Sequence, residues 1–418
     1  MAGTAPGPLR VLVAGGGVAG LETLLALRDL AGDRVETSLL SPEDEFVYRP
    51  MAVGEPFSRG HAQRHRLDAI ARHLGARLIR GSLAEVDDGA RVAVTADGER
   101  LSYDALVVAI GAESEPALTR ALTWTPESDA EVYGGLLRDL EEGYSKRVAF
   151  VVPLGVAWPL PAYELALMTA WEVQGMGMDD VQITIYTPES APLDIFGAAA
   201  ARALREDLDA VGIEVQTSAY VTEADGRLVT EPGARPLDAN RVVALPRAVG
   251  PALPGVSGDV RGFVRCDRHG KVAGASTVWA AGDAIAFPVK QGGLAAQQAD
   301  AVAEAIAARA GADILPEPFR PVLRGVLLTG RGKAWMRSAS AGGGEGEAER
   351  RALFWPPTKI AGRYISPFLA ELDEAEALGR APQPSGQPVE LDLERDMPAA
   401  ADALRTTERV PASRGGGQ

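Results

Sequence analysis

Three glycines near the amino terminus have the spacing that a bound diphosphate requires. Gly15, Gly17 and Gly20 form the pattern Gly-x-Gly-x-x-Gly directly after the apolar run Leu9 to Ala14. The first glycine permits a tight turn, the second lets the backbone approach a pyrophosphate, and the third lets a helix pack closely against a strand. Amide groups at the start of that helix point at the anion. The pattern predicts a dinucleotide site.

The residues around these glycines have the periodicities of a strand, a helix and a second strand. Leucines follow the turn at spacings of three and four residues, and Val35 to Leu40 is a second apolar run that ends at Ser41. One βαβ unit of this kind predicts a parallel, doubly wound sheet. The acidic side chain that would bind ribose hydroxyls at the end of the second strand is replaced by Ser41, with Glu43 as the other candidate. Because serine carries no charge, we expect the adenosine end to be held less firmly.

A second unit with the same pattern follows. Apolar runs at Arg147 to Val152 and Val181 to Thr187 flank a helical pattern from about Ala162 to Val173. Two further apolar runs, Leu101 to Ala112 and Val278 to Ala286, are predicted strands that return to the first unit. The first unit is therefore expected to be interrupted by the second.

Three separated motifs resemble those of the flavoproteins with two dinucleotide-binding domains, the superfamily of pyridine nucleotide-disulfide oxidoreductases. The motifs are Val13 to Glu22, Tyr103 to Ala112 and Val278 to Ala284, and they span most of residues 9–310. Within that superfamily the chain is most similar to sulfide:quinone oxidoreductases and type II NADH dehydrogenases. The resemblance implies bound FAD and an α/β fold with two Rossmann-like doubly wound domains and a small carboxy-terminal element.

The predicted domain organisation follows from the periodicities and from this resemblance. Residues 1–115 and 245–320 are expected to form the FAD-binding Rossmann domain, which residues 116–244 interrupt as a degenerate NAD-type domain. Residues 321–380 are expected to form a carboxy-terminal capping element. From residue 381 to residue 418 the chain is rich in proline, alanine and charge, which predicts a disordered tail.

By the same resemblance, several side chains are expected at the flavin. Asp283 of the Ala-Gly-Asp motif would hydrogen-bond the ribityl chain, although an aspartate in this position also suits a helix cap. The helix that starts after Gln291 would direct its amides at the pyrimidine edge, with Lys290 either adding positive charge or lying solvated in a loop. The segment Tyr48-Arg49-Pro50 matches an aromatic-x-Pro segment beside the isoalloxazine. The predicted cofactor-binding residues are Gly15, Gly17, Gly20, Ser41, Arg49, Pro50, Ala109, Gly111, Gly282, Asp283, Lys290 and Gln291.

The turn of the second unit lacks the glycine pattern. Three prolines, Pro153, Pro159 and Pro161, remove amide donors, and Trp158 adds bulk where the backbone would have to approach phosphates. Ordinary NAD(P)H binding is therefore disfavoured, and a variant loop that binds the nucleotide differently is the alternative.

The residues after this turn, Pro161 to Glu164, match the Pro-Ala-Tyr-Glu of sulfide:quinone oxidoreductases. Those enzymes place a redox cysteine just before it, where this chain has Trp158. Because Cys266 is the only cysteine, a three-cysteine sulfide mechanism cannot operate. Glu164 corresponds to a glutamate thought to relay protons to quinone in type II NADH dehydrogenases, and an exposed helix position is its alternative. Glu164 and Lys290 are the candidate catalytic residues.

Support for a quinone site is partial. Gln298 falls where type II NADH dehydrogenases carry the second glutamine of their quinone motif, whereas Leu294 replaces the first. The segment Leu353 to Tyr364 is the densest aromatic stretch after the two units. It either covers the flavin and lines an apolar acceptor pocket or forms the core of a small capping domain.

Composition restricts the cellular context. A net charge of −15 disfavours nucleic acid and anionic lipid as partners, and a single cysteine excludes an internal disulfide and a Cys-x-x-Cys motif, so no metal site is predicted. No apolar run reaches the roughly 18–20 residues of a spanning helix, and no basic amphipathic carboxy-terminal helix supports membrane attachment. Met1 to Arg10 lacks the features of an export signal, so we expect a cytoplasmic protein.

The sequence therefore predicts an FAD-dependent oxidoreductase that passes electrons from a small donor to a quinone-like or protein acceptor. Two alternatives stay open. One is an NAD(P)H-dependent flavin reductase or dehydrogenase of the ferredoxin-reductase or type II NADH dehydrogenase kind. The other is a non-catalytic flavin-binding protein or subunit. The residues specify neither the donor and acceptor nor the choice between monomer and homodimer.

Overall fold

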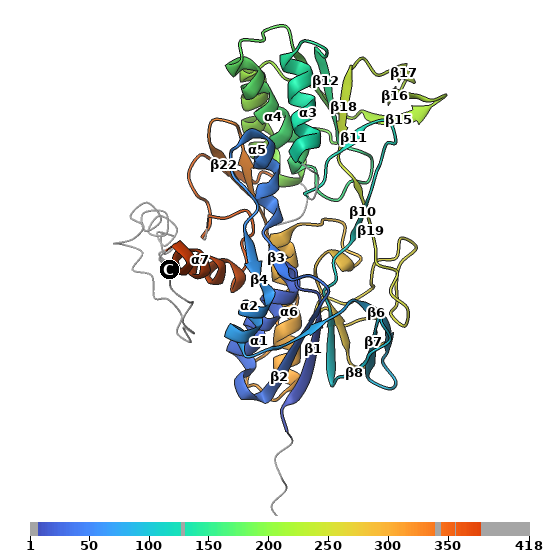
Figure 1. The fold of residues 1–418 in the computed structure, drawn as a ribbon, viewed down its shortest axis with the longest axis vertical. Helices are drawn as coiled ribbons and strands as arrows, with labels where there is room; N and C mark the ends of the chain where they lie inside the picture. The colour runs from blue at the N-terminus through green and yellow to red at the C-terminus, as the bar shows by residue number, and fades with distance from the viewer. Residues whose placement is uncertain (1–6, 127–129, 339–343, 356, 378–418) are drawn as a thin grey trace, which may run out of the picture.

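The computed structural model describes residues 7–126, 130–338, 344–355 and 357–377. The tail predicted for residues 381–418 lies outside the described residues. Figure 1 shows two α/β units stacked along the long axis of the molecule, with the amino-terminal unit below and the inserted unit above.

The lower unit is built on a sheet of five parallel strands. They lie in the order β20 (Val278–Ala280), β9 (Ala105–Val108), β1 (Leu9–Ala14), β2 (Val35–Ser41) and β5 (Arg77–Arg80). β20 pairs with β9 although about 170 residues separate them in the chain, so the late apolar run does join the first sheet. Helices α1 (Val18–Ala31) and α6 (Gly292–Arg309) pack against each other beside this sheet. Their contact brings the glycine turn and the Ala-Gly-Asp motif to the same end of the unit.

The upper unit repeats this plan. Its parallel strands lie in the order β11 (Leu122–Thr123), β18 (Arg241–Ala244), β12 (Arg147–Val151), β13 (Gln182–Tyr186) and β14 (Glu214–Gln216). Its helices are α3 (Ala130–Glu141), α4 (Leu160–Gly175) and α5 (Ala198–Ala210). Two parallel sheets with helical crossovers confirm the predicted α/β class with two Rossmann-like units.

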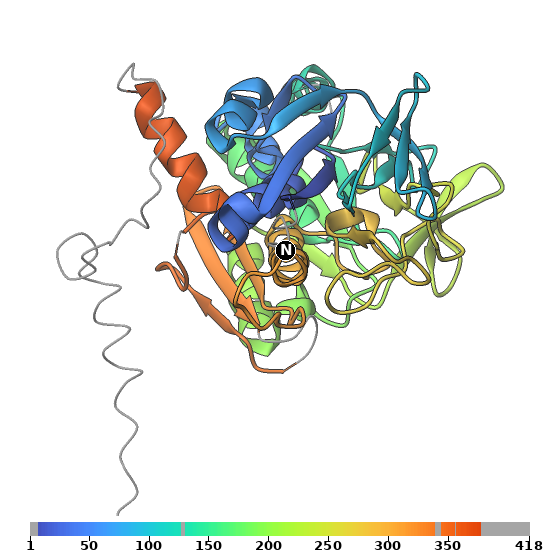
Figure 2. The ribbon, with the colours of Figure 1, turned by 90° about the horizontal axis from the view of Figure 1, so that it is seen from below.

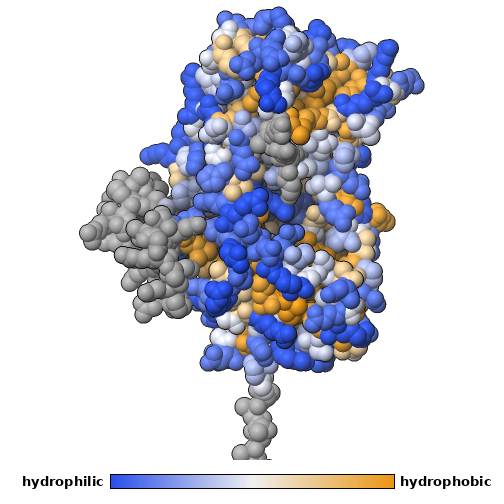
Figure 3. All heavy atoms as spheres, in the orientation of Figure 1, coloured by the Kyte–Doolittle hydropathy of each residue, from blue (hydrophilic) through white to orange (hydrophobic). Residues whose placement is uncertain are grey.

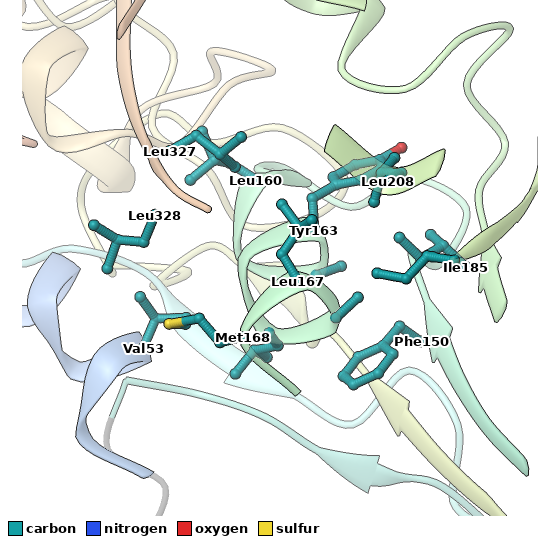
Figure 4. Close-up of a cluster of buried hydrophobic side chains, with 14 of the residues drawn as sticks. Val53, Phe150, Leu160, Tyr163, Leu167, Met168, Ile185, Leu208, Leu327 and Leu328 are labelled. Carbon is teal, nitrogen blue, oxygen red and sulfur yellow. The ribbon is translucent and has the colours of Figure 1, made fainter. Parts of the chain in front are cut away.

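Helix α4 forms the centre of the upper core. Most of its residues are buried around the whole circumference, because strands, helices and the carboxy-terminal sheet surround it. Figure 4 shows Tyr163, Leu167 and Met168 between Phe150 and Ile185 of the parallel sheet on one side and Leu327 and Leu328 on another. The latter two come from β21 (Leu323–Leu328), so the carboxy-terminal element packs directly on α4.

Short ladders and 3-10 turns complete both units. An antiparallel ladder of β10 (Glu113–Glu115) and β19 (Arg247–Val249) links the two units where the chain passes between them. The remaining elements before the carboxy-terminal element are η1 (Gly32–Arg34), β3 (Glu45–Val47), η2 (Arg49–Phe57), β4 (Arg64–Arg66), α2 (Leu67–Leu74), β6 (Leu83–Asp87), β7 (Val92–Thr95), β8 (Arg100–Ser102), η3 (Asp194–Phe196), β15 (Tyr220–Ala224), β16 (Arg227–Glu231), β17 (Arg235–Pro236) and η4 (Gly282–Ala284).

The carboxy-terminal element contains a small sheet and one helix. β21 pairs in an antiparallel manner with β22 (Lys333–Ser338), which pairs with β23 (Glu347–Glu349). Helix α7 (Ile365–Ala377) instead lies against the lower unit beside α1 (Figure 2). The segment that connects them therefore passes across both units.

Apolar side chains on the face in Figure 3 gather in separate patches among hydrophilic residues. Within the described residues, no helix combines the length and the apolar character needed to cross a bilayer.

Two acidic side chains are buried together where α1, α6 and the start of α7 meet. Glu22 of α1 is fully buried, and it accepts hydrogen bonds from the backbone amides of Tyr364 (3.0 Å) and Ile365 (2.6 Å). Asp300 of α6 lies within hydrogen-bonding reach of Glu22. Burial, followed by the nearby Glu22 charge, raises the pKa of Asp300 from 3.8 to about 8, while Arg363 opposes the shift. The Asp300 carboxyl therefore keeps its proton to a higher pH than an exposed aspartate does.

Replacing Asp300 with asparagine is expected to remove a pH dependence of stability. The folded state holds the Asp300 proton more tightly than the unfolded chain does, so the free energy of unfolding should fall as pH rises from about 4 to about 8. Asparagine can still donate a hydrogen bond to Glu22 but cannot ionise. Thermal unfolding should therefore give similar Tm values for both proteins near pH 5 and a higher Tm for Asp300→Asn at pH 8.5. If the Tm values of the two proteins changed in parallel across this pH range, the raised pKa of Asp300 would be contradicted.

Candidate functional site

The three glycines of the first turn serve different purposes. A Cβ atom on Gly15 would lie 2.2 Å from the Ala109 carbonyl oxygen, and one on Gly20 would lie 1.8 Å from the Gly15 carbonyl oxygen, so both positions exclude a side chain. Gly17, the N-cap of α1, has φ −84°, which any residue can adopt, and its Cβ direction meets nothing within 4 Å. Packing therefore does not explain Gly17, whereas a ligand phosphate in the open space beside it does.

The end of β2 offers a buried hydroxyl to this turn. Ser41 is fully buried, and its Oγ accepts a hydrogen bond from the backbone amide of Glu43 (3.2 Å). A Cβ on Gly16 would lie 2.9 Å from the same Oγ, which shows how closely Ser41 approaches the glycine turn. Glu43 is exposed. Ribose binding by either residue stays a prediction.

Strand β9 supplies the other wall of the turn. The amide of Ala109 donates to the Ala14 carbonyl at 2.8 Å, which holds the loop after β9 next to the loop after β1. Gly111 has φ +77°, a left-handed conformation that favours glycine. The two predicted residues Ala109 and Gly111 therefore lie at the same sheet edge as the glycine turn.

Asp283 lies beside the start of α1. A Cβ on its neighbour Gly282 would lie 2.9 Å from the Ala19 Cβ of α1, so the two motifs are in direct contact. Burial raises the pKa of the Asp283 carboxyl, and the charges of Lys290 and Arg49 lower it. Among the described residues, none donates a hydrogen bond to this recessed carboxylate. The side chain can therefore accept hydrogen bonds from a polyol.

Lys290 is held in place rather than solvated in a loop. Its Nζ donates to the Ile285 carbonyl and lies 3.9 Å from the centre of the Phe263 ring. Burial lowers the pKa of Lys290 to about 8, against the raising effect of Asp283. The prediction that Arg49 and Lys290 share a site with Asp283 agrees with these electrostatic contacts, and their role in cofactor binding stays a prediction.

Helix α6 begins as expected but uses its glutamines internally. The Gln291 side chain caps the helix by accepting from the Leu294 amide (2.9 Å), and its Nε2 donates to the Arg324 carbonyl (3.2 Å). Gln298 accepts from the Gly282 amide at 2.9 Å and so fixes the Ala-Gly-Asp turn. Both side chains are therefore engaged within the protein, and their roles at a quinone or a cofactor stay predictions.

The turn of the upper unit is held by contacts with neighbouring segments. Trp158 packs edge-on against Phe196, with ring centres 5.7 Å apart, and the Ala157 carbonyl accepts from the Lys290 amide at 3.2 Å. These contacts tie the proline-rich loop to the start of α6. The three prolines remove amide donors from this loop, whereas the amides of Leu154 and Gly155 donate no hydrogen bond to the described residues.

A second feature of the upper unit is a carboxylate near the position of a dinucleotide ribose. Glu189 follows β13, close to the place where an acidic residue would hold ribose hydroxyls. Its Oε2 accepts hydrogen bonds from Tyr163 (2.6 Å) and Thr187 (2.9 Å), and burial raises its pKa to about 7. The Glu189 Oε1, by contrast, is buried without a hydrogen-bond partner among the described residues, so one acceptor of this carboxylate is unused.

Glu164 is buried and ion-paired, so the alternative of an exposed helix residue is wrong. Its carboxylate oxygens lie 2.6 and 2.7 Å from the Lys359 Nζ, and the Leu328 amide donates to Oε1 at 2.8 Å. Only 1% of Glu164 is exposed. Burial raises the pKa of Glu164 and lowers that of Lys359, and each charge opposes the shift of the other.

The sequence did not single out Lys359, although a lone lysine within an aromatic segment is a signal of a buried partner. Its neighbour Ile360 donates its amide to the Tyr48 hydroxyl at 2.8 Å, and the Lys359 carbonyl faces the Gln291 Nε2. The pair therefore lies between the Tyr48 segment and the start of α6, on the side covered by the carboxy-terminal element.

Comparison with known proteins agrees with this geometry. Residues 4–137 match the family described as pyridine nucleotide-disulphide oxidoreductase. The sulfide-quinone reductase of Aquifex aeolicus (strain VF5) is 28% identical over 213 residues, which cover 47% of this chain and 48% of that protein. The chain thus matches about half the length of this curated relative.

Solved structures share the fold over more of the chain. The sulfide:quinone oxidoreductase of Aquifex aeolicus superposes with a TM-score of 0.73 at 20% identity, covering 82% of this chain and 86% of that one. The ferredoxin reductase for the CYP199A2 system from Rhodopseudomonas palustris gives 0.58 at 18% identity over 78% and 81%. Residues 4–137 thus match the pyridine nucleotide-disulphide oxidoreductase family, and most of the chain shares its fold with these solved structures.

Proposed function

We propose that the chain is an FAD-dependent oxidoreductase that passes electrons from a small donor to a quinone-like or protein acceptor. The observation that carries this proposal is the contact between the Gly17 turn and the Asp283 motif. Open space beside a helix amino terminus suits a diphosphate, and a recessed carboxylate without a protein donor suits a polyol chain. A single FAD molecule carries both groups.

The residues at this site have distinct roles in the proposal. The backbone at Gly17 binds the diphosphate, and Asp283 accepts hydrogen bonds from the polyol. FAD, when bound, supplies reversible uptake of two electrons. The cation at Lys290 favours negative charge nearby, and Glu164 with Lys359 holds a buried proton that can be exchanged with an acceptor.

Two observations shape the choice of donor. The three prolines and the bulky Trp158 of the upper turn oppose ordinary NAD(P)H binding, and Cys266 as the only cysteine opposes a route through several thiols. The proposed donor is therefore a small molecule that reacts directly at the flavin. The NAD(P)H-dependent alternative stays open, because the amides of Leu154 and Gly155 and the Glu189 Oε1 have no hydrogen-bond partner among the described residues.

Purified full-length protein is expected to be yellow and to release FAD on denaturation. Under anaerobic conditions, NADH at micromolar concentrations should not bleach the flavin absorbance rapidly, whereas dithionite should, which controls for a reducible flavin. Fast and complete bleaching by NADH would overturn the prediction that the upper turn disfavours NAD(P)H. A colourless protein that does not take up added FAD would overturn the proposed function itself.

A further inference from the structure

A pocket lies at the junction of the two units, apart from the elements that cover Glu164. It has a volume of about 360 Å³, and its lining includes Leu154 and Gly155 of the upper turn, Glu115 of β10, Arg247 and Val249 of β19, and Arg261. This volume is in the range of small-molecule sites. The exposed upper turn therefore forms one wall of this pocket, which is open to solvent.

Backbone contacts hold the two arginines of this pocket in place. The Arg247 Nη2 donates to the Ala117 carbonyl at 3.3 Å, and the Arg261 Nη2 donates to the Ala248 carbonyl at 2.9 Å. A guanidinium has five N–H donors, so each arginine keeps donors for a ligand. Neither arginine forms an ion pair with Glu115 among the described residues. Their positive charges are therefore not cancelled by direct contact.

The pocket connects with the predicted flavin site through one aromatic ring. The Arg261 guanidinium lies 5.2 Å from the centre of the Phe263 ring, and the Lys290 Nζ lies 3.9 Å from the same centre. Lys290 in turn faces Asp283, and its amide is bonded to Ala157 of the upper turn. Three cations thus lead from the pocket toward Asp283 in a chain whose net charge is −15.

We propose that this pocket binds a small organic carboxylate, held by Arg247 and Arg261. Guanidinium groups match a carboxylate in geometry and in charge, and the local positive charge attracts an anion that the rest of the acidic surface repels. The apolar side of the ligand would lie on Leu154, whose side chain is exposed in the pocket wall. The proposal deepens the proposed function, because it assigns the donor to the class of small carboxylates.

Glu115 allows a test of the charge of the ligand. Its carboxylate lines the same pocket, so it repels an anionic ligand and attracts a cationic one. Glu115→Gln should therefore bind a carboxylate more tightly than the wild type. Arg261→Ala should bind it about 10-fold more weakly or worse, since a charged hydrogen bond is lost. Arg265→Ala is the matched control, because Arg265 is exposed in the same segment but does not line the pocket.

The experiment is calorimetric titration of the full-length protein with lactate and with succinate at low ionic strength, without turnover. Lactamide, the neutral counterpart of lactate, should not bind. Equal affinity of Arg261→Ala and Arg265→Ala, weaker binding by Glu115→Gln, or equal binding of lactamide would each overturn the proposal. The same titration on the Gly17→Glu variant separates the carboxylate proposal from the FAD proposal. Carboxylate binding should persist in this variant, because the pocket does not include Gly17.

Discussion

Replacing Gly17 with glutamate is expected to give a folded protein that no longer binds FAD. The backbone angles of Gly17 suit any residue, and its Cβ direction meets no protein atom within 4 Å, so the new side chain should not disturb packing. It would instead place a carboxylate where the diphosphate is proposed to lie, at the amino terminus of α1. We expect FAD affinity to fall by more than about 100-fold, because both space and charge oppose the phosphates.

The comparison with Gly20 makes this prediction specific. A Cβ on Gly20 would lie 1.8 Å from the Gly15 carbonyl oxygen, so Gly20→Ala should lower Tm as well as FAD content. Gly17→Glu should lower FAD content alone, with the Tm of the flavin-free wild type unchanged. FAD content is measured from the absorbance spectrum and from flavin released on denaturation. Wild-type FAD content in Gly17→Glu would refute a diphosphate at this turn.

Replacing Lys359 with methionine should produce the largest loss of stability. It would leave the Glu164 carboxylate buried without its cation, and breaking a buried pair from one side costs about 3–5 kcal/mol of unfolding free energy. The double variant Glu164→Gln with Lys359→Met removes both charges and should recover most of this loss. Urea unfolding of the wild type, both single variants and the double variant would measure the coupling.

An exposed ion pair provides the control. Lys146 and Asp180 form a surface pair, so Lys146→Met should have an unfolding midpoint close to that of the wild type. Lys359→Met would then cause only a small loss of unfolding free energy if Glu164 could take up a proton at little cost. A small effect at pH 7 that grows at pH 9 would show this, whereas a small effect at both pH values would contradict a buried ion pair. In turnover assays, Glu164→Gln should also alter the pH profile if Glu164 exchanges a proton with the acceptor.

The sequence predicted the elements that depend on local periodicity. The glycine turn, β1 and α4 each follow from apolar spacing or from a short motif, and the structure places them as expected. The two returning strands are shorter than predicted. β9 covers only Ala105–Val108 of the run Leu101 to Ala112, and β20 covers only Val278–Ala280 of the run Val278 to Ala286, because a 3-10 turn begins at Gly282. The burial of Glu164 could not be derived in this way. Its partner Lys359 lies 195 residues away, and α4 is buried on all sides by elements distant in the chain.

The hydrogen-bond partners of polar side chains also could not be predicted from the sequence. Gln291 and Gln298 occupy positions of a motif, but hydrogen bonds with Leu294 and Gly282 decide their roles. Asp300 is one of many acidic residues in the sequence, and its raised pKa follows from its burial and from the nearby Glu22. Such assignments depend on three-dimensional neighbours rather than on residue type.

The segment from Thr358 to Ser366 forms polar contacts with both units. Within nine residues it supplies the cation for Glu164, an amide for the Tyr48 hydroxyl and two amides for Glu22. A protease cut or a stop codon just before this segment would leave three buried polar groups unsatisfied on two different units. Shortened versions for crystallisation should therefore end beyond residue 366. A carboxy-terminal affinity tag should likewise follow residue 366.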